Sequence, residues 1–163
     1  MRRQRVRAAY FAVLTSTALA GGTSYAADAA ESGAKIYAAE CAACHDATGT
    51  GIAGFGSQLA GPSVARLKAP GGRVYLAQVV VHGIAGVFEL DGQRQFAAMP
   101  NAGALTDEQL AAVLNHVLRV HNAKMLPVDF TPFTTAEIAA ARAAARTPRE
   151  LHRTKLELER AAK

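Results

Sequence analysis

The sequence predicts an all-α protein, and three observations support this fold class. Half of the 163 residues are apolar, 19% are charged and alanine is abundant, so the chain can bury a core and favours helix. A capping box begins at Thr106, and the apolar residues after it recur at helical spacing. The two cysteines, Cys41 and Cys44, lie one helical turn apart, after a stretch that also reads as helix.

The first 26 residues read as an export signal rather than as part of the fold. Four arginines within residues 2–7 precede an apolar run over residues 8–20, and Ser24 and Ala26 fit the small positions before a signal-peptidase cut. The apolar run is shorter than the roughly 20 residues that span a bilayer, which disfavours the alternative of an uncleaved membrane anchor. We expect an exported, periplasmic protein without a membrane span in its mature form.

Net charge does not indicate a nucleic-acid partner. The whole chain has a formal charge of +5, but the export signal holds four of its arginines and none of its acids. The remaining chain carries 14 basic and 13 acidic residues. A nearly neutral mature protein has no net-charge attraction to nucleic acid or to an anionic membrane surface.

Cys41, Cys44 and His45 form the motif with the most specific chemistry. A thioredoxin-like dithiol would follow a strand, whereas residues 31–40 read as helix. A structural zinc site would need a second pair of ligands at metal spacing, which the sequence lacks. Covalent haem attachment uses all three residues, because the thiols add to the two vinyl groups and the adjacent histidine becomes the proximal iron ligand. The motif therefore predicts one covalently bound haem c per chain.

Met99 is the best candidate for the second axial ligand of the iron. It lies in a stretch of small residues before the last helix of the domain, and Pro100 restricts its backbone. A filled sixth position favours electron transfer, whereas an open one favours ligand binding or catalysis. The alternatives are that Met99 only fills the core, or that His82, at the end of an expected helix over residues 73–82, binds the iron.

The chain resembles class I c-type cytochromes over approximately residues 31–122. The resemblance rests on the Cys41–His45 motif with the helix before it, the glycine-rich loop after it, Met99-Pro100 and the last helix. It implies a cytochrome c fold of three to five helices around one haem, within residues 27–124. It also implies that His45 and Met99 are the metal ligands, and that a carbonyl beside Pro62 accepts the proton of the proximal imidazole.

Two further features of the domain concern its packing. The family's last helix crosses the first helix near Gly33 and Tyr37, but this chain has His116 where the family usually has an aromatic residue. Asp91-Gly92, between short alternating segments, predicts a small hairpin before Met99.

Residues 125–163 predict a helical C-terminal extension. Prolines indicate an extended linker over residues 123–132, followed by a helix that Thr134 or Thr135 caps and that runs to Arg146. A second helix would begin at Pro148 and reach about residue 162. Because this helix has few apolar residues, a solvated tail is one interpretation. A docking arm for a partner subunit is the other, since similar tails accompany cytochromes of periplasmic dehydrogenases.

The resemblance implies a periplasmic electron carrier rather than an enzyme. Its redox partners would be a dehydrogenase as donor and another cytochrome or a terminal oxidase as acceptor. Two alternatives remain open: a fixed haem subunit of a larger dehydrogenase complex, and a haem sensor or peroxidase-like protein with a labile sixth ligand.

Overall fold

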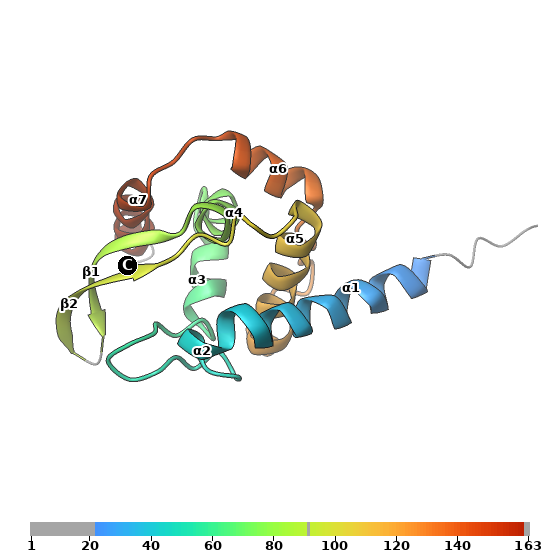
Figure 1. The fold of residues 1–163 in the computed structure, drawn as a ribbon, viewed down its shortest axis with the longest axis horizontal. Helices are drawn as coiled ribbons and strands as arrows, with labels where there is room; N and C mark the ends of the chain where they lie inside the picture. The colour runs from blue at the N-terminus through green and yellow to red at the C-terminus, as the bar shows by residue number, and fades with distance from the viewer. Residues whose placement is uncertain (1–21, 91, 162–163) are drawn as a thin grey trace, which may run out of the picture.

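The computed structural model describes residues 22–90 and 92–161 (Figure 1). Its helices are α1 (Gly22–Ile36), α2 (Ala42–His45), α3 (Pro62–Lys68), α4 (Gly72–His82), α5 (Asp107–His116), α6 (Thr135–Ala143) and α7 (Pro148–Ala161). Two π-helical segments, η1 (Tyr37–Cys41) and η2 (Val117–His121), continue α1 and α5. The predominance of helix confirms the predicted fold class.

The predicted export signal lies mostly outside the described residues, because the description begins at residue 22. Within the described ranges, no helix has both the length and the apolar character that crossing a membrane requires.

Helices α1 and α5 cross at the centre of the molecule (Figure 1). A Cβ atom at Gly33 would lie 2.4 Å from the carbonyl oxygen of Ala112, so the two backbones meet where only glycine fits. The ring of Tyr37 is 2% exposed, and its centroid lies 5.4 Å from that of His116. The expected crossing is therefore present, with an imidazole in the place of the family's aromatic ring.

Helix α5 begins as the sequence predicts. The Thr106 hydroxyl accepts the backbone N–H of Gln109, whose side chain accepts the N–H of Thr106. The apolar face that follows is buried, with Leu110 and Leu118 fully inaccessible to solvent.

The predicted hairpin is present as β1 (Ile84–Leu90) and β2 (Gln93–Met99), which pair antiparallel. The register pairs Ile84 with Met99 and Leu90 with Gln93. Met99 is thus the last residue of a strand and not part of a loop, which corrects the sequence-based expectation. Because side chains alternate along a strand, Met99 shares a face with Ala97.

The C-terminal extension folds back over the domain (Figure 1). Helix α6 contacts α4 and α5, and α7 contacts α4 and β1. The buried apolar side chains of the extension are Phe133, Ile138, Ala141, Leu151 and Leu158. The interpretation of this segment as a solvated tail is therefore wrong.

Candidate haem-binding site

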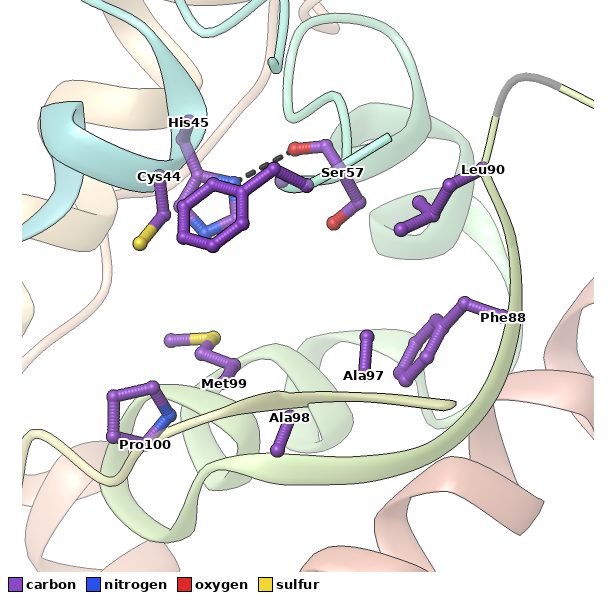
Figure 2. A pocket seen from close by; sticks show the side chains of 11 residues that line it. Cys44, His45, Ser57, Phe88, Leu90, Ala97, Ala98, Met99 and Pro100 are labelled. Atoms are coloured by element: carbon purple, nitrogen blue, oxygen red, sulfur yellow. Dashed lines mark hydrogen bonds between the residues drawn. The ribbon is translucent and has the colours of Figure 1, made fainter. Parts of the chain in front are cut away.

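One cavity lies between the Cys41–His45 motif, the loop after it and the hairpin (Figure 2). Its empty volume is about 500 Å³, part of which is open solvent at the mouth, and this falls within the usual range of ligand sites. The lining residues are Cys44, His45, Phe55, Gly56, Ser57, Phe88, Leu90, Ala97, Ala98, Met99 and Pro100. Apolar side chains dominate the wall, so the cavity suits a large, flat, apolar group.

His45 is buried at one side of this cavity. Its Nδ1 lies 2.7 Å from the carbonyl oxygen of Ser57. Because a carbonyl only accepts, Nδ1 carries the proton and Nε2 keeps its lone pair for a metal. The loop reaches His45 through Gly56, where a Cβ atom would lie 1.5 Å from the carbonyl oxygen of Cys44.

The role predicted for the carbonyl beside Pro62 is wrong, since Ser57 supplies the acceptor. Pro62 begins α3 and lines a separate, smaller cavity with Arg66 and Leu158. It is not among the residues that line the large cavity.

The turn directly after His45 is fixed by hydrogen bonds. The Asp46 carboxylate accepts the backbone N–H of Thr48 at 2.9 Å, together with the hydroxyls of Thr48 and Thr50. These bonds, those from Thr48 first, lower the pKa of Asp46 to about 2. The Tyr37 hydroxyl donates to the Asp46 carbonyl at 2.7 Å. His45 is thereby anchored on both sides of its backbone.

Cys41 and Cys44 are free thiols, and neither is fully buried. Burial raises the pKa of the Cys41 thiol to about 11, with smaller contributions from Glu40 and Cys44. A redox-active dithiol requires a lowered thiol pKa, so this environment disfavours the dithiol interpretation.

Met99 faces the cavity from the side opposite to His45 (Figure 2). His82, the alternative ligand, points elsewhere, because its Nε2 lies 2.8 Å from the carbonyl oxygen of Ala141 in α6. His116 and His121 lie beside Tyr37 at the crossing of the first and last helices of the domain.

Sequence reasoning missed two parts of the site. The carbonyl of Ser57 carries no side-chain signal, although the glycine before it indicates a close backbone approach. The hairpin wall, formed by Phe88, Leu90 and Ala97, could have been found from the alternation of residues along each strand.

The residues present fit a covalently bound haem. Two thiols lie next to an imidazole with an available Nε2, and a thioether faces them across an apolar cavity. This combination of nitrogen and sulfur donors is the one that holds haem iron in cytochromes c.

Comparisons with known proteins agree with this geometry. The family model for cytochrome c matches residues 30–121. The chain is 40% identical over 119 residues to "Cytochrome c-552" of Thermus thermophilus, covering 73% of this chain and 90% of the relative. It is equally similar to a second "Cytochrome c-552", from a named strain of Thermus thermophilus, of which 80% is covered. The chain therefore belongs to the cytochrome c family, as a class I monohaem c-type cytochrome that binds haem c covalently and transfers electrons through it.

Proposed function

We propose that the mature chain is a periplasmic carrier of single electrons, with His45 and Met99 as the axial ligands of its haem. Cys41 and Cys44 would form the two thioether links. The observation that carries this proposal is the placement of His45 and Met99 on opposite sides of one apolar cavity.

The protein residues tune and protect the redox centre. Haem iron, when bound, supplies a one-electron couple between the ferric and ferrous states. The bond from His45 to the Ser57 carbonyl fixes the imidazole orientation and raises its basicity. The neutral sulfur of Met99 favours the ferrous state and so raises the reduction potential. Apolar side chains of the hairpin exclude water from the cavity.

A filled sixth position supports electron transfer over the sensor or peroxidase-like alternative. With both axial positions occupied by side chains of the same fold, no external ligand reaches the iron without displacing Met99. The firmly held turn after His45 keeps rearrangement between oxidation states small.

The export signal over residues 1–26 supports a periplasmic location. There a dehydrogenase would supply electrons, and another cytochrome or a terminal oxidase would accept them. Phe55 lines the cavity and is 63% exposed, so it offers an apolar contact at the mouth for such transient, small interfaces. The packing of the extension on its own domain favours a free carrier over a fixed subunit.

The absorption spectra of ferric and ferrous Met99→Ala protein test the ligand assignment. We expect the variant to lose the far-red charge-transfer band of methionine-bound ferric haem and to bind carbon monoxide readily when reduced. Met125→Ala is the matched control, because Met125 is 45% exposed and does not line the cavity. An unchanged spectrum of the Met99 variant would contradict the proposal.

A further inference from the structure

The C-terminal extension holds the segment that carries Met99. We define the Met99 segment as residues 84–107, which comprise the hairpin and the loop up to α5. The extension begins after the part of the chain that matches the family model, which ends at residue 121. It grips the Met99 segment at two points, one on each side of Met99 in the sequence.

The first point is Arg142 in α6. Its Nε donates to the Asp107 carboxylate at 2.7 Å, and its two terminal nitrogens donate to the carbonyls of Gly103 and Leu105, each at 2.9 Å. One half-buried guanidinium thus fixes the loop that leads from Met99 to α5. The loop cannot move away from the cavity without breaking these bonds.

The second point is His152 in α7. Its Nε2 donates to the carbonyl of Val87 at 2.8 Å, and its ring meets the ring of Phe88 edge-on at 4.9 Å. The imidazole occupies the space that Gly86 leaves open, since a Cβ atom there would lie 2.3 Å from the ring. Val87 pairs with Phe96, so this contact acts on the strand that ends in Met99.

The extension is itself firmly attached to the body of the protein. Leu151 is fully buried, which fixes the first turn of α7. The imidazole of His82 meets the carbonyl of Ala141, directly before Arg142. Arg142 and His152 therefore project from fixed elements, and each can restrain the hairpin and its loop.

We propose that Arg142 and His152 are positioning residues for the sixth ligand, and that the extension is a strap that keeps the Met99 segment closed over the cavity. This inference rests on the proposed ligation by Met99. A thioether is a weak iron ligand that external ligands can displace, and the segment has to open before Met99 leaves. Bonds that exist only in the closed state shift this equilibrium toward methionine ligation.

Arg73 provides a matched control within the same chain. It also donates to one carboxylate, that of Glu137, and to two carbonyls, those of Thr131 and Pro132. These bonds attach the extension to α4, and none of them reaches the Met99 segment. Arg73→Gln and Arg142→Gln therefore remove the same kinds of bond from different places.

The test is the equilibrium binding of imidazole to the ferric holoprotein, which requires displacement of Met99. We expect Arg142→Gln to raise the affinity for imidazole about tenfold, because the closed state loses its charge-assisted bonds. Arg73→Gln should change it less than about twofold. His152→Phe keeps the ring contact with Phe88 but loses the bond to Val87, so a smaller increase is expected.

A second measurement separates positioning from general stability. Denaturant unfolding of each holoprotein gives its free energy of unfolding, and Arg142→Lys serves where Arg142→Gln does not fold. If Arg142 and Arg73 variants lose similar stability but only the Arg142 variants bind imidazole more tightly, the strap is supported.

Equal imidazole affinities in the Arg142 and Arg73 variants would overturn the strap while leaving methionine ligation intact. The Met99→Ala spectrum distinguishes the two failures. If that spectrum equals the wild-type spectrum, both the ligand assignment and the strap are wrong.

Discussion

At the scale of single residues, Gly33 sets how closely α1 approaches α5. A Cβ atom there would lie 2.4 Å from the Ala112 carbonyl oxygen and 3.1 Å from the Cβ atom of His116. The first of these neighbours is helix backbone, which cannot rotate away as a side chain can. The first and last helices of the domain would have to separate to admit a methyl group.

We therefore predict that Gly33→Ala lowers the free energy of unfolding by about 1–3 kcal/mol. Helix propensity alone predicts the opposite sign, because alanine is favoured over glycine within a helix by about 1 kcal/mol. Denaturant unfolding of the holoprotein measures the difference. A stabilised variant would show that the two helices do not meet at this point.

Three rings meet at the same crossing. The Tyr37 ring lies 4.5 Å from that of His121, and the two imidazoles of His116 and His121 are 5.1 Å apart. Burial lowers the pKa of both histidines below the ordinary 6.5, and their mutual repulsion lowers that of His116 further. Asp46 opposes this by slightly raising the pKa of His121.

Both histidines make stability depend on pH in a defined direction. The unfolded chain binds protons near pH 6.5, whereas the folded protein binds them only at lower pH. The stability from neutral histidines is thus fully present above pH 6.5 and is lost as pH falls below it. We predict that the free energy of unfolding decreases from pH 7.5 to pH 5, and that His121→Phe reduces this decrease. Equal decreases in the variant and the wild type would refute this.

Sequence and structure differ in what each reveals about single residues. The spacing of Cys41, Cys44 and His45 predicts the attachment chemistry, because that chemistry depends on side chains a few positions apart. Ser57 and Arg142 act through partners far along the chain or through a backbone atom, so local pattern contains no signal for them.

At the scale of elements, the helices and the hairpin could be predicted, but the packing of the extension could not. The capping boxes at Thr106 and Thr134 place the starts of α5 and α6. Helix α7 has few apolar residues, which suggested solvent exposure. Its Leu151 and Leu158 lie one above the other on one face, and that face meets the body of the protein. A narrow apolar stripe is enough when a matching surface exists.

The extension should accordingly behave as part of the core. We predict that Ile138→Ala lowers the free energy of unfolding by about 2–5 kcal/mol, because this fully buried side chain would leave a cavity between α6 and its neighbours. Val128→Ala, in the exposed linker, should change it by no more than about 0.5 kcal/mol. A similar, small effect for both variants would mean that α6 is not packed in solution.

At the scale of the whole molecule, the chain surrounds its cavity in sequence order. The N-terminal helices and the following loop supply Cys41, Cys44 and His45, and the hairpin supplies Met99. The extension then returns over the hairpin and the loop that follows it (Figure 1). Stability of the outer layer and ligation at the centre are thereby coupled through the Met99 segment.

The attachment of this outer layer predicts how the molecule responds to acid. Glu137 accepts the Arg73 guanidinium and caps α6 through Thr134, and the bond from Arg73 does most to lower its pKa from 4.5 to about 2. The unfolded chain takes up this proton at higher pH than the folded protein does. The stabilisation is therefore present above pH 4.5 and disappears as pH falls toward 2.

We predict that Glu137→Gln lowers the free energy of unfolding at pH 6 but has little effect at pH 2.5, so that the two stability curves converge in acid. The exposed Glu157→Gln is the control and should leave the curve unchanged, because the Glu157 side chain is not packed against the body. Denaturant midpoints of the holoproteins across this pH range measure both curves. A constant difference between wild type and the Glu137 variant would mean that the carboxylate's charge does not attach the extension.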